Sequence, residues 1–194
     1  VAARNMEDRD PAYDKERFHI TLLAMDNKGF ENLCRLITEA ETNGKYYKPR
    51  IDHRVMEKYN EGLICLSGCA GSEISMAIRN DDEERLKKLV EWYSKVYDGR
   101  FYLEMQDHGH PDSPTHWSEQ TKINDRLMKL HEETGLPLVV TCDAHYIHHS
   151  DQEAHEVLLC VGTGSKISET NRMSLKDFQL HVIPPNEIIE RWKD

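Results

Sequence analysis

The stretch FHITLLA at residues 18–24 decides the fold class of this chain. Its run of apolar residues, interrupted by His19 and Thr21, is typical of a buried β-strand. A turn follows at residues 26–29, and apolar residues then recur at helical spacing at Phe30, Leu33, Cys34, Leu36, Ile37 and Ala40. A buried strand that leads directly into an amphipathic helix is the repeating unit of α/β folds.

The same alternation of strand and helix occurs three more times along the chain. Further strands are predicted at residues 62–67, 101–105 and 138–141. Helices are predicted from Ser72, over residues 86–97, over residues 123–130 and, behind a capping-box spacing from Ser150 to Glu153, over residues 154–161. Four strands, each followed by a helix, predict parallel pairing in an α/β fold. Periodicity alone leaves open whether the sheet is open or closed into a barrel.

The composition narrows the class of protein. The 194 residues include 25 Lys and Arg against 35 Asp and Glu, so the formal net charge is −10. This acidic balance argues against a stand-alone nucleic-acid binder, but it allows nucleic acid as the substrate of a metal site, because bound cations reverse the local field. No apolar run approaches the roughly 20 residues of a membrane-spanning helix, so neither a membrane partner nor a secretory signal is expected.

Cysteine and histidine usage points to a reduced chain with metal chemistry. Five cysteines without a CxxC pair fit a cytoplasmic protein better than a disulfide scaffold. Cys34, Cys65 and Cys160 fall on predicted apolar faces and are expected in the core. The 11 histidines are a generous supply of metal ligands.

The sharpest local signal for a site is TCDAH at residues 141–145, where the fourth predicted strand ends. Positions two apart in a strand face the same side, so Asp143 and His145 should project together while Cys142 faces away. Parallel α/β folds place their sites at this end of the strands. A carboxylate beside an imidazole suits Zn²⁺, Mn²⁺ or Fe. The more frequent alternative is a carboxylate that orients a structural histidine.

Four other residues could contribute to such a site. Cys69 follows the second strand and could be a thiolate ligand or a nucleophile, although a cysteine between small residues is more often a small buried hydrophobe. His19 lies inside an apolar strand, where a histidine is more often a hydrogen-bonded core residue than a ligand. Glu104 and His108 belong to EMQDHG at residues 104–109, which suits either substrate contact or a solvated loop.

Several segments are predicted to be loops or edges. Residues 5–14 and 108–117 are polar and contain proline, which is typical of surface loops. KYYKPR at residues 45–50 interleaves basic and aromatic side chains, the composition of a small nucleic-acid contact or of a hydrated loop. The chain after Thr163 is less regular and is predicted to form edge elements or the start of a further domain.

Six segments together resemble the PHP (polymerase and histidinol phosphatase) domain of the bacterial DNA polymerase III alpha subunit. They are FHITLLA at 18–24, YYKPR at 46–50, GLICLSGC at 62–69, EMQDHG at 104–109, CDAHY at 142–146 and AHEVLLCVGTG at 154–164. The resemblance runs in order from Val1 to about Trp192. It implies a single domain over residues 1–194, with residues 164–194 leading towards whatever follows.

The resemblance also implies a fold and a set of site residues. The family fold is a distorted (β/α)7 barrel with a metal cluster at the C-terminal rim of its strands. Matched position by position, His19, Cys69, Asp143 and His145 are the implied ligands of two or three Zn²⁺, Mn²⁺ or Fe ions. Glu104 or His108 would orient the nucleophile or the substrate. The remaining family ligands, including an H-x-H motif, are expected upstream of Val1.

The function implied by the resemblance is that of part of the catalytic alpha subunit of a replicative DNA polymerase, with a metal-dependent 3′–5′ exonuclease for proofreading. The implied partners are the DNA primer–template, a separate exonuclease and the sliding clamp. A non-catalytic scaffold that stabilises the polymerase or docks that exonuclease is a second hypothesis. A small-molecule phosphoesterase, like the histidinol phosphatases of the family, is a third, which the segments at 46–50 and 157–164 argue against.

Overall fold

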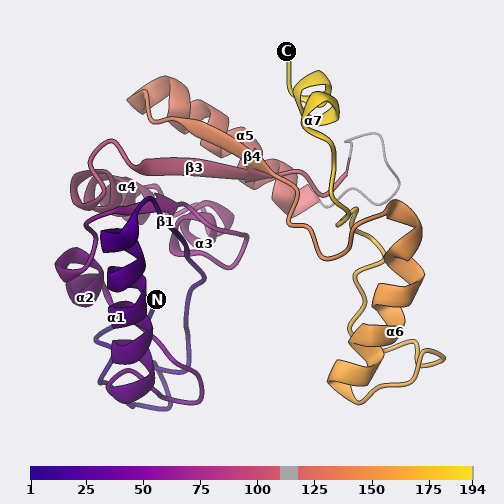
Figure 1. The fold of residues 1–194 in the computed structure, drawn as a ribbon, viewed down its shortest axis with the longest axis horizontal. Coiled ribbons are helices and arrows are strands. Elements are labelled where there is room, and N and C mark those ends of the chain that lie inside the picture. The colour runs from indigo at the N-terminus through magenta and orange to yellow at the C-terminus, as the bar shows by residue number, and fades with distance from the viewer. Residues whose placement is uncertain (110–117, 194) are drawn as a thin grey trace. The chain divides into compact units, whose positions relative to one another are not determined.

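The structure is a computed structural model that describes residues 1–109 and 118–193 (Figure 1). Its elements are β1 (Thr21–Ala24), α1 (Asn27–Thr42), α2 (His53–Lys58), β2 (Leu63–Leu66), α3 (Glu73–Arg79), α4 (Glu83–Val96), β3 (Phe101–Gln106), α5 (Ser118–Thr134), β4 (Leu138–Thr141), the short 3-10 helix η1 (His149–Asp151), α6 (Gln152–Thr163) and α7 (Pro185–Arg191). This order confirms the α/β class and the predicted alternation. The loop predicted at residues 108–117 lies, beyond Gly109, outside the described residues.

The chain divides into two compact units. The first comprises Val1–Glu104 and Arg126–Val139, and the second comprises Met105–Asp125 and Val140–Asp194. The single domain predicted over residues 1–194 stays a prediction. None of the helices within residues 1–109 and 118–193 combines the length and the apolar character needed to cross a membrane.

The four strands form one sheet in the order β1-β2-β3-β4. β2 and β3 pair in parallel, as predicted, with Cys65 opposite Phe101. β1 and β2 pair antiparallel, with Thr21 opposite Leu66, so the expectation of parallel strands throughout is wrong for this pair. The connection between them contains two helices, α1 and α2, where periodicity predicted one, and it returns the chain to the end at which β1 stops.

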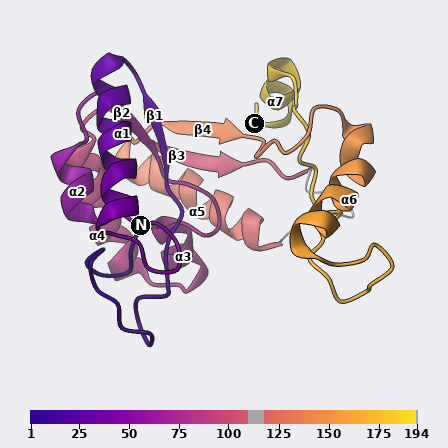
Figure 2. The same cartoon turned by 60° about the horizontal axis from the view of Figure 1, so that its bottom comes forward.

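Two glycines form the corner that reverses the chain between β1 and β2. The Met25 N–H donates to the Gly62 carbonyl at 2.8 Å, so the start of β2 lies against the end of β1. Gly62 has a φ of +71°, and a Cβ built on Gly29 would lie 1.9 Å from the Gly62 carbonyl oxygen. Only glycine allows this approach of two backbones. The Asp26 carboxylate caps α1 by accepting from the Gly29 N–H, and α1 then runs beside β1 and β2 (Figure 2).

Gly29→Ala is expected to destabilise the protein by about 3 kcal/mol, because the added methyl group overlaps backbone that has no room to yield. The midpoint of urea unfolding measures this loss. Gly162→Ala is the matched control, since a Cβ on Gly162 in α6 meets nothing within 4 Å. Alanine there should add about 0.5–1 kcal/mol of helix stability. Equal midpoints for the two variants would contradict the assignment of the corner.

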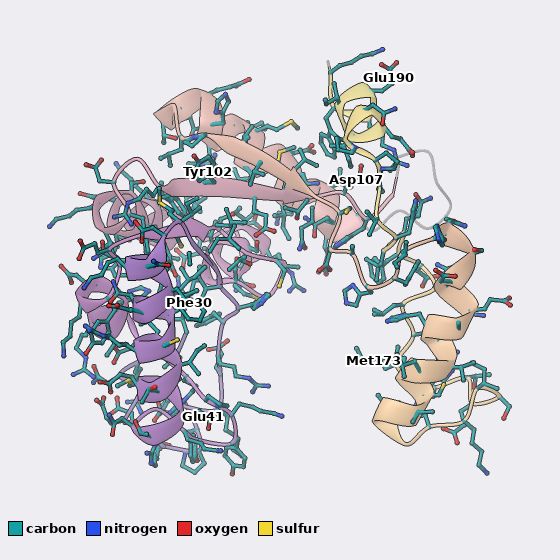
Figure 3. The ribbon with its side chains drawn as sticks, in the orientation of Figure 1. Phe30, Glu41, Tyr102, Asp107, Met173 and Glu190 are labelled. Atoms are coloured by element: carbon teal, nitrogen blue, oxygen red, sulfur yellow. The ribbon has the colours of Figure 1, made fainter. Side chains whose placement is uncertain are left out.

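The face that α1 buries differs from the predicted one. Gly29, Asn32, Leu36 and Ala40 are buried, and the Asn32 amide donates to the Glu61 carbonyl at 2.8 Å. Phe30 is 63% exposed (Figure 3), and Cys34, expected in the core, is also exposed. The prediction for Cys34 is wrong because the close contact at Gly29 and the polar contact of Asn32 set the rotation of the helix. Cys65 and Cys160 are buried, as predicted.

A cluster of hydrogen-bonded polar side chains, packed against aromatic rings, connects α2, α3 and α4. The buried Glu73 carboxylate accepts from Tyr93 Oη and contacts His53 Nε2, each at 2.7 Å. The His53 ring stacks on Trp92 at a centroid distance of 3.9 Å, and Tyr93 stacks on Phe101 at 5.3 Å. Burial raises the pKa of Glu73, but the hydrogen bonds from His53 and Tyr93 outweigh burial and leave that pKa below its ordinary value. The charged carboxylate therefore stabilises the fold.

Glu73→Gln is expected to cost about 1–2 kcal/mol of stability near neutral pH, because the charged hydrogen bonds to the carboxylate are lost. Since the pKa of Glu73 is lowered by folding, its contribution is present above the unfolded pKa of about 4.3 and disappears as the pH falls through the lower folded value. Urea midpoints of both proteins between pH 3 and 7 should therefore converge at the acid end. Glu57→Gln, at an exposed position on α2, is the control and should show no such convergence. A constant difference at every pH would contradict this role for Glu73.

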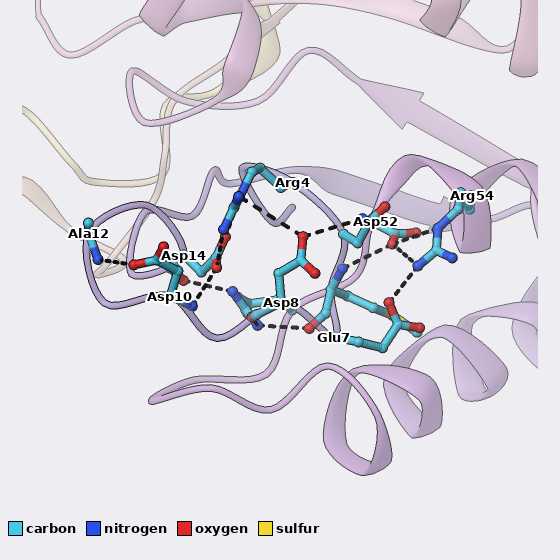
Figure 4. A network of polar contacts seen from close by, with 11 residues as sticks. Arg4, Glu7, Asp8, Asp10, Ala12, Asp14, Asp52 and Arg54 are labelled. Atoms are coloured by element: carbon cyan, nitrogen blue, oxygen red, sulfur yellow. Dashed lines mark hydrogen bonds and ion pairs between the residues drawn. The ribbon is translucent and has the colours of Figure 1, made fainter.

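The N-terminal loop predicted on the surface is anchored at several points. Met6 and Asp14 are buried. The Asp14 carboxylate accepts from Arg4, and Asp52 accepts from the Met6 N–H at 3.0 Å and from Arg54 (Figure 4). Residues 5–14 form a largely exposed loop, as predicted, but the buried Met6 and Asp14 anchor it to the packed part of the first unit.

In the second unit, α6 begins differently from the prediction. Residues 149–151 form η1, and the Asp151 carboxylate accepts from the His148 N–H at 2.9 Å. Ser150 lies inside this turn, so the capping box predicted from Ser150 to Glu153 is wrong. Glu156 of α6 is fully buried and holds the following segment through Arg172, Ser174 and the Leu175 N–H, at 2.7–2.8 Å.

Candidate functional site

His19 and Cys69 lie side by side in the first unit. The strand predicted at residues 18–24 begins at Thr21, and His19 precedes it in a bridge to Ser72, with its N–H donating to the Gly71 carbonyl at 3.0 Å. Cys69 lies in the loop between β2 and α3. His19 Nδ1 and Cys69 Sγ are 3.0 Å apart, so two predicted ligands that are 50 residues apart in the sequence are in contact.

The surroundings of this pair favour positive charge on the imidazole. The hydrogen bond to Cys69 raises the pKa of His19 and outweighs the effect of burial, and the Coulomb field of Glu104 adds to the rise. Glu104 itself is buried on β3, and its N–H donates to Ser67 Oγ at 2.8 Å. The first unit therefore combines an imidazole, a thiol and the field of a buried carboxylate, as expected for the lining of a cation site.

Asp143 and His145 lie in the second unit, beyond the end of β4 at Thr141. Asp143 has a φ of +45°, so the chain leaves the extended conformation and the alternation of sides predicted for Cys142, Asp143 and His145 does not apply. That interpretation is wrong in its geometry. His145 is exposed, with Nδ1 2.6 Å from the Asp143 carbonyl oxygen and its N–H donating to the Leu180 carbonyl. His148 and His149 are exposed, and His155 packs against His145.

His108 joins Asp143 in this unit. Its Nε2 lies 3.4 Å from Asp143 Oδ2, and its ring packs edge-on against Phe178. The Gln179 N–H donates to the His108 carbonyl at 2.8 Å. The imidazole is largely buried, and within residues 1–109 and 118–193 neither ring nitrogen has a well-aligned hydrogen bond. A buried imidazole that points at a carboxylate is suited to hold or accept a proton.

Asp107 has a structural role next to His108 (Figure 3). It is 2% exposed, and its carboxylate accepts from the Gly109 N–H at 3.0 Å, from Trp192 Nε1 at 3.1 Å and from Arg191 Nη1 at 3.2 Å. The segment after Thr163 was predicted to be an edge, but Gln179, Arg191 and Trp192 hold the two residues at the end of β3. No sequence signal marks these contacts, because Arg191 and Asp107 are 84 residues apart.

Imidazole, thiolate and carboxylate side chains are all suitable ligands for Zn²⁺, Mn²⁺ or Fe. Of the four implied ligands, His19 and Cys69 lie in the first unit, and Asp143 and His145 lie in the second. In a tetrahedral zinc site the Zn–S bond is about 2.3 Å long and the Zn–N bond about 2.0 Å long. The sulfur and the nitrogen are then roughly 3.5 Å apart. The separation of 3.0 Å between His19 Nδ1 and Cys69 Sγ is close to this value, and the buried His108 nitrogens are further donors without a strong competing bond. In the part of the chain that the structure describes, no three His, Cys, Asp or Glu side chains group as a metal site.

A model of the PHP domain family matches residues 3–108, which is more than half of the chain. The chain therefore belongs to the PHP domain family, as its motifs indicated. It is also similar to named proteins: it is 38% identical over 177 residues to DNA polymerase III subunit alpha of Deinococcus radiodurans. It is 37% identical over 180 residues to that of Borreliella burgdorferi and 36% identical over 190 residues to that of Thermus aquaticus.

These matches cover nearly all of the chain but a small part of each relative. They take in 90%, 93% and 97% of this chain, in the same order, and 13%, 15% and 15% of the relatives. The chain thus spans about one seventh of the length of the curated relatives it matches.

Proposed function

We propose that this chain acts within a bacterial replicative DNA polymerase and that its PHP site hydrolyses phosphodiester bonds in the 3′–5′ direction, with Zn²⁺, Mn²⁺ or Fe ions as cofactors. The observation that carries the proposal is the contact of His19 with Cys69, because an imidazole and a thiol from distant segments meet where the family resemblance aligns two ligands. Two or three bound ions would act as Lewis acids on the scissile phosphate.

The first unit would supply two ligands. His19 would hold a metal ion as a neutral imidazole, and Cys69 would hold it as a thiolate. Glu104, whose field reaches His19, favours the positive charge of a bound cation. These residues hold the cofactor and do not themselves transfer a group.

The second unit contains the other two implied ligands, Asp143 and His145. Asp143 can offer one carboxylate oxygen as a ligand while Oδ2 faces His108 Nε2 at 3.4 Å and orients the ring. His108 or Glu104 would orient the nucleophile or the substrate, as the family resemblance implies. His145, exposed next to Asp143, would be the remaining ligand.

Metal content and hydrolysis together test this proposal. The natural protein and its Asp143→Ala/His145→Ala variant are analysed for metal per chain and assayed on a primer–template and on a phosphate monoester. Bound Zn, Mn or Fe that is lost in the variant, with 3′–5′ cleavage of DNA lost in parallel, is the expected result. Monoester cleavage without DNA cleavage would favour the small-molecule phosphoesterase instead.

A non-catalytic scaffold is the second candidate, favoured by the lack of a three-residue metal grouping within residues 1–109 and 118–193. It predicts metal near zero in both proteins and partner docking that Asp143→Ala leaves unchanged. Under either proposal the partners would be the DNA primer–template and other replisome subunits, such as the separate exonuclease and the sliding clamp. Co-elution of each subunit with the natural protein and with the variant separates docking from catalysis.

A further inference from the structure

Tyr47 stands out in the loop that follows α1. Its side chain is 68% exposed, and its φ of +59° is rare for a residue other than glycine. The Lys48 N–H donates to the Tyr46 carbonyl at 2.7 Å across it, which makes Tyr47 the centre of a tight γ-turn of the strained kind. An aromatic side chain held in a strained turn and directed to solvent requires an explanation in terms of function.

Arg50 fixes the position of this turn. It is 2% exposed and donates to the carbonyls of Gly44, Asp14, Met6 and Asp8 at 2.7–3.1 Å. Its guanidinium also lies 5.3 Å from the centroid of the Tyr46 ring. Arg50 is therefore unavailable as a nucleic-acid contact, which corrects that part of the interpretation of residues 45–50. It ties the Tyr47 turn to the N-terminal loop that carries Lys15.

A cationic groove connects this turn with the candidate site. Lys15 Nζ lies 5.5 Å from the centroid of the Tyr47 ring. Lys15 and Arg17 line an open groove of about 590 Å³ together with Pro49 and His19, the residue in contact with Cys69. Glu16 is the acidic residue of the lining, so the groove has a net positive charge in an otherwise acidic chain. All of these residues belong to the first unit.

We propose that this surface, formed by Tyr47, Lys15 and Arg17, binds single-stranded nucleic acid and leads it to the His19–Cys69 pair. One base stacks on Tyr47, and the phosphates that follow it contact Lys15 and Arg17. Exposed aromatic rings with cationic side chains beside them are the general means of binding single strands without sequence preference. The proposal rests on the proposed function, since it names the substrate class of the same site, but it requires no hydrolysis to be tested.

Site-specific cross-linking tests the contact in the natural protein. A photoreactive p-benzoylphenylalanine replaces Tyr47 in one protein and Phe30 in another, because Phe30 on α1 is an aromatic residue of similar exposure, 63% against 68%. Each is irradiated with a labelled oligothymidylate in the presence of a chelator, so that cleavage does not interfere. We expect a strong cross-link from position 47 and at least a tenfold weaker one from position 30.

Charge reversal tests the phosphate contacts. Lys15→Glu/Arg17→Glu in the cross-linking protein should raise the oligonucleotide concentration for half-maximal cross-linking at position 47 at least tenfold. The loss of two phosphate contacts should lower the slope of log affinity against log salt by about 1.4. Lys88→Glu, on the exposed face of α4, is the matched control and should leave both values unchanged. Thermal melting of each variant verifies that the fold is retained.

The outcomes separate this inference from the proposed function. Equal cross-links from positions 47 and 30, or a cross-link that Lys15→Glu/Arg17→Glu does not weaken, would overturn the inference even if the protein hydrolyses DNA. A selective, charge-dependent cross-link in a protein without hydrolytic activity would uphold the binding surface and count against the nuclease. If Tyr47 cross-links to another replisome subunit in place of the oligonucleotide, the surface is a protein interface and the inference is wrong.

Discussion

His19→Ala should reduce 3′–5′ hydrolysis and metal affinity by more than about a hundredfold, since even residues that only support a metal ligand typically contribute 10–100-fold. The side chain of His19 is exposed and contacts Cys69, so stability should change by no more than about 0.5 kcal/mol. Metal per chain, the rate of primer shortening and the urea midpoint are measured on the same preparation. Loss of function without loss of stability is the expected combination.

Cys69 provides the matched comparison. Cys69→His replaces a soft thiolate by an imidazole, which is also a good ligand for Zn²⁺, and should retain metal and activity, whereas Cys69→Ser keeps a hydrogen bond to His19 but offers a poor ligand for Zn²⁺. If all three variants are as active as the unmodified protein, the His19–Cys69 pair is a structural contact and the nuclease proposal loses the observation that supports it. If Cys69→His alone is active, the position binds metal.

Local signals in the sequence located most of the secondary structure. The apolar runs at residues 62–67 and 138–141 correspond to β2 and β4, and the helix predicted over residues 123–130 lies within α5. The antiparallel pairing of β1 with β2 was missed because it depends on a contact between Gly29 and Gly62. Gly29 lies in a predicted turn and Gly62 at the start of a predicted strand, and neither signals that the two backbones meet. The helix α2 has 6 residues, which is too short to show periodicity.

Family resemblance named the candidate site residues, but the sequence did not predict their local geometry. His19 and Cys69 were identified by family resemblance, and the structure brings them together. The strand alternation used for Asp143 fails because one left-handed residue ends the extended chain, and a single aspartate gives no sign of that conformation. Asp107, adjacent to His108, is held by contacts from the C-terminal segment that no local sequence signal reveals.

Arg50→Leu is expected to destabilise the protein by about 3–5 kcal/mol, the largest effect on stability of any variant considered. The buried guanidinium donates four hydrogen bonds to backbone carbonyls that come from two separate loops. Leucine fills part of the volume but leaves those carbonyls without donors, and each buried unsatisfied group costs about 1–3 kcal/mol. Arg50→Lys should recover little, because an ammonium group is a point donor and cannot reach carbonyls in four directions.

Arg54→Ala is the control that separates burial from charge. Arg54 makes ion pairs with Glu7 and Asp52, but its side chain is 60% exposed, so its loss should cost less than about 1 kcal/mol. Urea midpoints compare the two arginines, and limited proteolysis tests the loop itself. In Arg50→Leu, cleavage within residues 5–14 should precede global unfolding, because the anchors at Met6 and Asp14 are released first. Equal costs for the two arginines, or protection of that loop in Arg50→Leu, would show that Arg50 does not hold the loops together.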